Sequence, residues 1–256
     1  MQGKTALVTG ASRGIGLKTV QALADEGLHV VGAARHVSPE LREVSPGAMA
    51  VDLTSAHGPE ELVEHAVSEL GGLDFVVNNV GGGEAVQFAG FLDIDDAQWQ
   101  ANLDVNLFTV IRTSRAALPH LIARRGSIIN VSSINARLPA PGIAAYNVAK
   151  AAVTALSKAL AEEFGPQGVR VNTVSPGVVR TAPWEEPGGI GTTVAAALGL
   201  EHSQFLDQLP QQFGLTTGRI TEPEEVARLI VFLLSGCAPN LIGADVAIDG
   251  GSLKTV

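Results

Sequence analysis

The chain has 256 residues, a formal net charge of −9 and 46% hydrophobic residues. The negative charge argues against nucleic acid or an anionic membrane as the main partner, because contact with phosphates requires clustered Lys and Arg. The length suits one α/β domain, and 29 glycines with few aromatic residues favour helices packed closely on a parallel sheet. The lone cysteine, Cys237, excludes an internal disulfide and is expected to be inert packing, and no Cys/His cluster has the spacing of a metal site.

Neither a signal peptide nor a membrane span is expected. Residues 1–4 lead directly into an apolar, strand-like run, without the apolar core and small-residue cleavage site of a signal peptide. The longest late apolar run, Leu229 to Leu234, is far shorter than the roughly 20 residues of a membrane helix. We therefore expect a soluble, cytoplasmic protein.

The first strand, Thr5 to Val8, is followed by a glycine-rich turn and then by a helix that reaches about Glu26. Glycines allow a tight turn and a close approach to pyrophosphate, and the start of the helix offers free N–H groups and the positive end of its dipole. A simple strand-to-helix turn is the alternative interpretation. The residues expected at the phosphates are Gly10, Ser12, Arg13, Gly14, Ile15 and Gly16.

The second strand, Leu28 to Ala34, ends at Arg35. At this point NAD-binding proteins of this fold class carry a carboxylate for the ribose 2′-hydroxyl, whereas an Arg accommodates a 2′-phosphate. The third strand, residues 48–51, leads to Asp52 and Leu53, where we expect the adenine; the alternative role of Asp52 is to cap a helix that begins near residue 59.

The fourth strand, Leu73 to Val77, leads into the stretch Asn78-Asn79-Val80-Gly81-Gly82-Gly83. Successive glycines beside paired amides indicate backbone brought close to a ligand, with a flexible loop as the alternative. A long helix is expected over about residues 95–124, and Asn106 lies inside it. Asparagine competes for backbone hydrogen bonds in a helix, so its position invites a functional explanation.

The fifth strand, Ser127 to Val131, delivers Ser133 to the same edge of the sheet. The next helix carries Tyr146, the only tyrosine, and Lys150, four residues later and therefore on the same face. A cation beside a phenol favours the phenolate, so the pair can act as general acid or base on a carbonyl that the Ser hydroxyl also binds. A core tyrosine with a surface lysine is the alternative.

The sixth strand, residues 169–174, leads to Pro176 and Gly177. Residues 181–218 contain no predicted strand and are interpreted as a lid over the site, with Glu185 and Glu186 on a solvated face. A capping box at residues 221–224 opens a helix to about residue 235, and the seventh strand is residues 245–248. Asn135 and Arg137 either line the pocket or are ordinary loop residues.

In combination these residues resemble the short-chain dehydrogenase/reductase family over essentially the whole chain. The matching stretches are the glycine motif of residues 9–16, Asn78-Asn79-Val80-Gly81, Asn106, Ser133, Tyr146-x-x-x-Lys150 and Pro176-Gly177-x-x-x-Thr181. Val80 stands where the family usually has Ala. The resemblance implies a single doubly wound, Rossmann-type α/β domain over residues 1–256, with a seven-stranded parallel sheet and helices on both faces.

The resemblance also implies roles for individual residues. Tyr146 is the implied general acid or base and Ser133 orients the carbonyl, while Lys150 binds the nicotinamide ribose and lowers the tyrosine pKa. Asn106 holds a water in a proton relay. The remaining implied cofactor contacts are Asn79, Val80, Gly81, Pro176, Gly177, Val179 and Thr181.

We therefore expect an enzyme that transfers hydride between NADP(H) and a small-molecule ketone or secondary alcohol. NADP(H) is expected to be preferred over NAD(H), because Arg13 and Arg35 border the adenosine ribose and no acid stands at position 34. The resemblance implies a homotetramer, which the small apolar run on the Tyr146 helix (Ala149, Ala151, Ala152, Val153 and Ala155) supports. A catalytically silent dinucleotide-binding regulator is the alternative, and a methyltransferase does not explain Tyr146 and Lys150.

Overall fold

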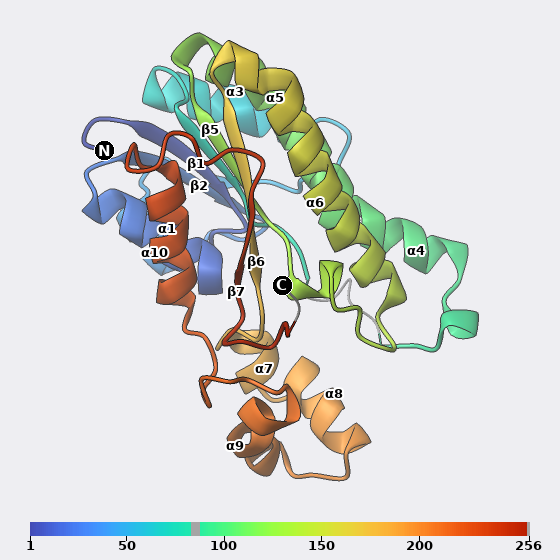
Figure 1. Cartoon of the computed structure of the whole chain (residues 1–256). Helices are drawn as coiled ribbons and strands as arrows, with labels where there is room; N and C mark the ends of the chain where they lie inside the picture. The colour runs from blue at the N-terminus through green and yellow to red at the C-terminus, as the bar shows by residue number, and fades with distance from the viewer. Residues whose placement is uncertain (83–87, 255–256) are drawn as a thin grey trace.

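The computed structural model describes residues 1–82 and 88–254, in which a parallel sheet has the strand order β3-β2-β1-β4-β5-β6-β7 (Figure 1). This arrangement confirms the predicted Rossmann-type fold. The strands are β1 (Thr5–Thr9), β2 (His29–Ala34), β3 (Met49–Ala50), β4 (Phe75–Asn78), β5 (Ser127–Val131), β6 (Arg170–Pro176) and β7 (Asp245–Ile248).

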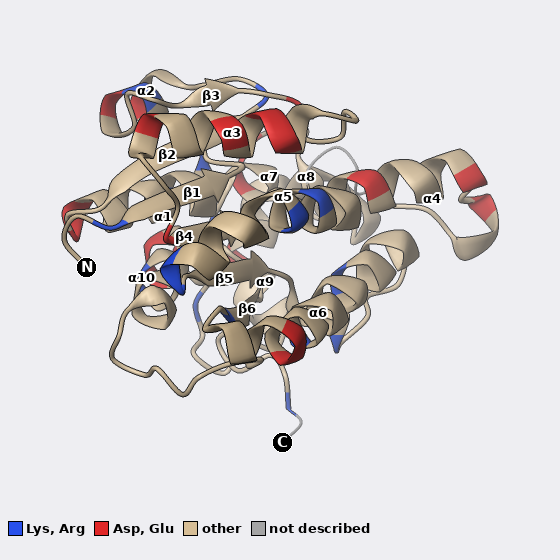
Figure 2. Cartoon of the chain, turned by 90° about the horizontal axis from the view of Figure 1, so that it is seen from above, with Lys and Arg blue, Asp and Glu red and all other residues tan. Residues whose placement is uncertain are grey.

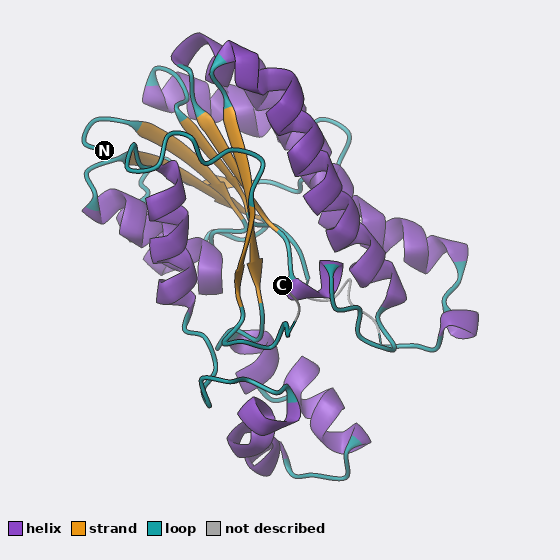
Figure 3. Ribbon diagram, viewed as in Figure 1, coloured by secondary structure: helices purple, strands orange, loops and turns teal. Residues whose placement is uncertain are grey.

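Helices cover both faces of the sheet (Figure 3). One face is covered by α1 (Gly14–Asp25), α2 (Pro39–Val44) and α10 (Pro223–Leu234), and the other by α3 (Gly58–Leu70), α5 (Thr109–Arg124) and α6 (Ala144–Phe164). The helix α4 (Asp96–Leu103) projects beyond α5. Short 3-10 turns are η2 (Phe91–Asp93), η4 (Ile134–Ala136) and η5 (Gly165–Gln167). Acidic residues recur along α3 on the outside of the molecule (Figure 2).

The core follows from the alternation of side chains along fully buried strands. In β1, Ala6 and Val8 pack in the layer beneath α1 and α10, while Leu7 packs in the opposite layer beneath α3 and α5. All three are fully buried. Because successive side chains in a strand point to opposite faces, a continuous apolar run is what a sheet with helices on both faces requires.

The long helix expected over about residues 95–124 is interrupted. A π-helical turn, η3 (Asp104–Phe108), separates α4 from α5, and Asn106 lies in the middle of this turn. A π turn widens the backbone hydrogen bonding to i→i+5, and such turns often occur at functional sites. Asn106 is thus unusual in its setting, as predicted, but the change from α-helix to π-helix was not predicted.

The capping box of α10 lies one residue later than expected. Glu222 is the N-cap residue, and its backbone N–H donates to Oε2 of Glu225 at 2.9 Å. Thr221 is not available as the cap, because its backbone pairs with the chain at Val178 and Arg180.

Residues 181–218 contain three helices, α7 (Ala182–Glu185), α8 (Ile190–Ala197) and α9 (His202–Gln212), and no strand. They extend beyond the carboxyl end of β6 and form a small core of their own around Phe205 and Leu209. The Trp184 ring stacks on Phe205 at 6.4 Å and meets Phe213 edge-on at 5.5 Å. The segment expected to be a lid therefore has internal packing that lets it keep its shape.

Cys237 is exposed, so the expectation that it packs in the core is wrong. It follows α10 directly, where the chain leaves the core. Within residues 1–82 and 88–254, every helix is too short or too polar to span a bilayer.

Candidate active site

The glycine loop after β1 is closely packed against the neighbouring chain. Gly10 and Gly14 have positive φ angles of 65° and 55°, which side-chain-bearing residues rarely adopt. A Cβ atom on Gly16 would overlap the carbonyl oxygen of Gly10. The same carbonyl accepts a hydrogen bond from Nδ2 of Asn79 at 3.1 Å. Glycine is therefore needed at all three positions for the loop to form.

The start of α1 can receive an anion. Arg13 is the N-cap residue in extended conformation and makes no side-chain cap, and the first turn of the helix contains no acidic residue. The N–H groups and the positive end of the helix dipole are thus not neutralised by a carboxylate of this turn. Ser12 and Ile15 lie half-buried beside them, and Ile15 also packs on the core.

Thr9 links the glycine loop to β4, a role that was not predicted from the sequence. Its Oγ1 accepts hydrogen bonds from the backbone N–H groups of Asn79 at 3.0 Å and Val80 at 3.2 Å. These bonds hold the turn after β4 directly beside the loop. Thr9 is a polar residue at the end of the apolar strand β1, and this pattern could have indicated its role from the sequence.

Arg35 and Asp52 lie at the ends of β2 and β3, and both are exposed. Hydrogen bonds from Thr54 to the Asp52 carboxylate lower the pKa of Asp52, and the positive charge of Arg35 lowers it further. Arg35 has no acid close to it in the sequence, but the pairing of β2 with β3 brings the Asp52 carboxylate close to it. Asp52 does not cap α3, whose N-cap is His57, and Leu53 is buried in the core.

Ser133 and Tyr146 meet at the end of β5. Ser133 caps η4, accepting a hydrogen bond from the backbone N–H of Asn135 at 3.2 Å, and its hydroxyl also hydrogen-bonds to the Tyr146 phenol. Burial raises the pKa of Tyr146 above its usual value, and the bond to Ser133 acts in the opposite direction. The expected lowering of this pKa by Lys150 is therefore not seen.

Lys150 is buried, which rules out the alternative of a surface lysine. The residue is 3% exposed, and Nζ donates a hydrogen bond to the carbonyl oxygen of Val131 at 3.0 Å. Nζ lies 5.8 Å from the centre of the Tyr146 ring. Burial lowers the pKa of Lys150 to about 8. The Ser132 hydroxyl supports this helix by donating to the backbone carbonyl of Lys150 at 2.9 Å.

Asn106 meets Lys150 at Gly81. Oδ1 of Asn106 accepts from the N–H of Gly82 at 2.8 Å, and Nδ2 donates to the backbone carbonyl of Asn102 at 3.1 Å. A Cβ on Gly81 would lie 2.7 Å from Nζ of Lys150 and 3.0 Å from Oδ1 of Asn106. Only glycine at position 81 leaves room for the side chains of Lys150 and Asn106. Gly83, in the same stretch, lies outside the described residues. Asn102 is buried and accepts the hydrogen bond from Asn106, a role that was not predicted from the sequence.

The chain after β6 returns to the glycine loop. The N–H of Gly177, which follows the buried Pro176, donates to the carbonyl of Ile248, and Val179 forms an isolated bridge with Thr221. Oγ1 of Thr181 donates to the carbonyl of Val179 at 3.2 Å. A Cβ on Gly14 would lie 3.2 Å from Cγ2 of Thr181. The two ends of the expected cofactor site are therefore adjacent.

Two polar residues near the site are engaged elsewhere. Arg137 donates to the backbone carbonyl of Asp245 at 2.9 Å and forms an ion pair with its carboxylate, so it is a structural link to β7. Glu185 is not simply solvated, because Arg180 binds it at 2.9 Å.

A family model described as "Enoyl-(Acyl carrier protein) reductase" matches residues 10–252. The chain belongs to the short-chain dehydrogenase/reductase family. This agrees with the resemblance carried by the motifs. The four-residue spacing of Tyr146 and Lys150 differs from the longer spacing of enoyl reductases related to this family, so the description of the family does not by itself assign double-bond reduction.

Relatives in the family act on different substrates by name. The chain is 33% identical to 3-oxoacyl-[acyl-carrier-protein] reductase FabG of Vibrio cholerae, covering 98% of both. It is 34% identical to 3-alpha-(or 20-beta)-hydroxysteroid dehydrogenase of Mycobacterium bovis, covering 98% of this chain and 90% of the relative. The solved structure of L-sorbose reductase from Gluconobacter frateurii, complexed with NADPH and L-sorbose, has a TM-score of 0.89 and 33% identity, covering 100% and 98% of the two chains.

Proposed function

We propose that this oxidoreductase transfers hydride between NADP(H) and a carbonyl or secondary alcohol, with Tyr146 as the general acid or base. The observation that carries the proposal is the meeting of Tyr146, Ser133 and the buried Lys150 at one edge of the sheet. A core tyrosine with no chemical role gives no reason to bury an ammonium group beside it, because burial of a charge is costly.

The residues present fit a nicotinamide dinucleotide. Three glycines and the start of α1 suit a pyrophosphate, and the loops after β4 and β6 lie next to them. We assign the phosphates to Gly10, Ser12, Arg13, Gly14, Ile15 and Gly16, and the nicotinamide end to Asn79, Val80, Gly81, Pro176, Gly177, Val179 and Thr181. A bound nicotinamide supplies or accepts the hydride.

The protein's own part is to bind the carbonyl and to move a proton. Ser133 and Tyr146 both present hydroxyl groups that can hydrogen-bond to one substrate oxygen. The raised pKa of Tyr146 keeps its proton at neutral pH, which suits donation to the oxygen during carbonyl reduction. Lys150 would bind the nicotinamide ribose, and Asn106, whose Oδ1 lies beside Gly81 together with the Lys150 ammonium, would hold a water in a relay of protons.

The preference for NADP(H) rests on two exposed arginines. Arg13 begins α1 and Arg35 follows β2, so both border the place of the adenosine ribose. A guanidinium meets a phosphate with paired N–H donors, each charge-assisted bond contributing roughly 1.5 to 3 kcal/mol. Asp52 holds a negative charge near Arg35, and we propose that it orients the guanidinium as well as meeting the adenine. The NADPH complex of L-sorbose reductase supports this assignment.

The substrate is proposed to be a small carbonyl compound or alcohol. The apolar residues of the lid favour a mostly apolar ketone.

The protein is proposed to be a cytoplasmic homotetramer. None of the named relatives supports the alternative of a catalytically silent regulator.

A turnover screen tests the proposal. Purified protein is assayed for oxidation of NADPH and NADH with a panel of aliphatic, aromatic, steroid and acyl-thioester ketones, and for reduction of NADP and NAD with the matching alcohols. We expect turnover with at least one ketone class and a higher kcat/KM with NADPH. Tight NADPH binding without turnover on the whole panel would support the silent regulator instead.

A further inference from the structure

Arg180 lies where the lid joins the rest of the protein, between the end of β6 and the first lid helix, α7. Its backbone N–H donates to the carbonyl of Thr221 at 2.9 Å, so its main chain is fixed to the body of the protein. The next residue, Thr181, is the N-cap of α7. Any change in the position of Arg180 is therefore passed directly to α7.

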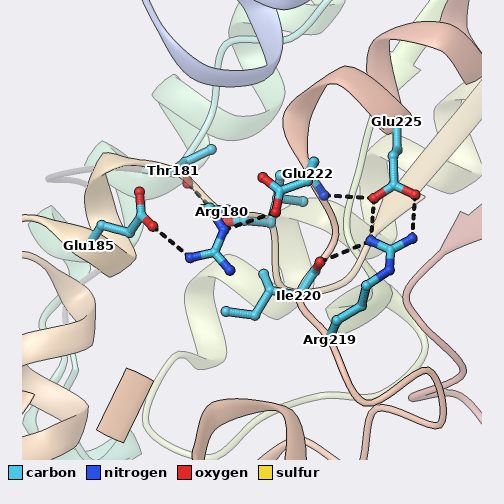
Figure 4. A network of polar contacts seen from close by, with 8 residues as sticks. Arg180, Thr181, Glu185, Arg219, Ile220, Glu222 and Glu225 are labelled. Carbon is cyan, nitrogen blue, oxygen red and sulfur yellow. Dashed lines mark hydrogen bonds and ion pairs between the residues drawn. The ribbon is translucent and has the colours of Figure 1, made fainter. Parts of the chain in front are cut away.

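The side chain of Arg180 binds two carboxylates in opposite directions (Figure 4). Nε donates to Oε1 of Glu222 at 2.9 Å, and Nη1 donates to Oε1 of Glu185 at 2.9 Å. Glu222 is the N-cap of α10, which packs on the sheet, whereas Glu185 is the last residue of α7. One guanidinium thus joins the lid to the body, and both carboxylates raise its pKa.

We propose that Arg180 is a positioning residue that ties α7 to the start of α10 and so sets the lid over the carbonyl site. The proposal rests on the proposed function for its kinetic consequence. We call the linked residues Glu185, Arg180 and Glu222 the tether. The tether contributes to substrate affinity although Arg180 does not contact the reacting atoms.

The internal packing of the lid carries this constraint beyond α7. Trp184, next to Glu185, packs against Phe205 of α9 and Phe213 after it. The backbone carbonyl of Trp184 also hydrogen-bonds to the ring Nε2 of His202 at 2.8 Å. Because α7 is bonded to α9 in this way, releasing Glu185 loosens the lid as a unit.

A second ion pair at the same end of α10 offers a matched control. Arg219 binds Glu225 through two bonds of 2.7 Å, and both residues lie outside the lid. Glu225→Gln removes the charge opposite Arg219 but keeps an acceptor for the N–H of Glu222, since Gln also serves in a capping box. It therefore removes one exposed ion pair without cutting the tether.

Trp184 reports on the tether without any need for turnover. The chain has two tryptophans, so the substitution Trp99→Phe leaves Trp184 as the single probe. In that background we measure acrylamide quenching of fluorescence for the parent, Glu185→Gln, Arg180→Gln and Glu225→Gln proteins. We expect higher quenching in the first two variants and parental quenching in Glu225→Gln, and we expect Glu185→Gln to add nothing in an Arg180→Gln background.

Salt and kinetics complete the test. Raising NaCl from about 0.05 to about 0.5 M screens exposed ion pairs and should raise quenching in the parent but not in Glu185→Gln. With a substrate from the screen, Glu185→Gln should raise KM for the carbonyl compound about two- to fivefold, the range for one exposed pair, with kcat and the Kd for NADPH unchanged. Equal quenching in Glu185→Gln, Arg180→Gln and Glu225→Gln overturns the tether whether or not the enzyme turns over.

Discussion

The ammonium nitrogen of Lys150 lies 5.8 Å from the centre of the Tyr146 ring and is bonded to the backbone carbonyl of Val131. The lysine is buried, so its proton is held less firmly than in water, while the phenol holds its proton more firmly. Burial thus shifts the two pKa values in opposite directions, upward for Tyr146 and downward for Lys150.

Burial of Lys150 predicts a pH dependence of stability. The pKa is about 8 in the folded protein, against an ordinary value of 10.5 for an exposed lysine, so between these values the unfolded chain binds more protons. The free energy of unfolding should therefore rise with pH in this window, by about 2 kcal/mol from pH 8 to 10 from this group alone. Urea unfolding of wild type and Lys150→Met at the two pH values measures it. The rise should shrink by this amount in the variant, and an equal rise in both proteins would contradict the buried, charged lysine.

Arg35 should carry much of the cofactor preference. Replacing Arg35 with Ala removes a guanidinium from the expected 2′-phosphate site and should raise KM for NADPH at least about tenfold, while KM for NADH hardly changes. Steady-state kinetics with both cofactors measure this, and Arg42→Ala on the exposed side of α2 serves as a control. A wild-type enzyme with a higher kcat/KM for NADH would overturn the assignment.

Gly16 should not tolerate a side chain. A methyl group there overlaps the carbonyl of Gly10, so Gly16→Ala should displace the loop, destabilise the protein by about 1 to 3 kcal/mol and weaken NADPH binding. Thermal unfolding and cofactor titration measure both effects. At Gly236 a Cβ meets nothing within 4 Å and φ is not positive, so Gly236→Ala is the control and should leave both measurements unchanged. Parental NADPH affinity in Gly16→Ala would count against this loop as the phosphate site.

The outer face of α6 should form a contact between subunits. Ala149 and Val153 are fully buried, as one face of the helix requires, but Val148 is 51% exposed and Ala151 and Ala155 are exposed as well. We expect light scattering at micromolar concentration to show a tetramer. Ala151→Arg, which places a charge on this face, should lower the mass. A monomeric wild type would refute the oligomer.

Apolar periodicity located the strands and most helices, because buried parallel strands and amphipathic helices leave clear patterns. It missed the π turn at Asn106, since the composition of this segment does not distinguish a π turn from an α turn. It also placed the cap of α10 at Thr221, whose backbone is in fact paired with the chain after β6.

Contacts between residues that are far apart in the chain were harder to predict from the sequence. Ser133, Tyr146 and Lys150 were expected in one cluster from the motif. The structure brings them together because Ser133 follows β5 and the ammonium of Lys150, on α6, reaches the carbonyl of Val131 at the end of the same strand. The charge of Asp52 near Arg35 and the binding of Glu185 by Arg180 were not foreseen, since each depends on how neighbouring strands or the start of the lid are placed. The predicted direction of the Tyr146 pKa shift was wrong, because burial, which the sequence does not show, raises this pKa more than the hydrogen bond with Ser133 lowers it.

The most direct test of the central claim is the substitution Tyr146→Phe, assayed for NADPH oxidation with the best ketone from the screen and for NADPH binding by titration. The phenylalanine ring still fills the space, and only the hydroxyl that carries the proton is lost. We expect turnover to be abolished while the Kd for NADPH stays within about twofold of wild type. A Phe variant that retained about a tenth or more of the wild-type kcat would show that the proton reaches the carbonyl oxygen by another route.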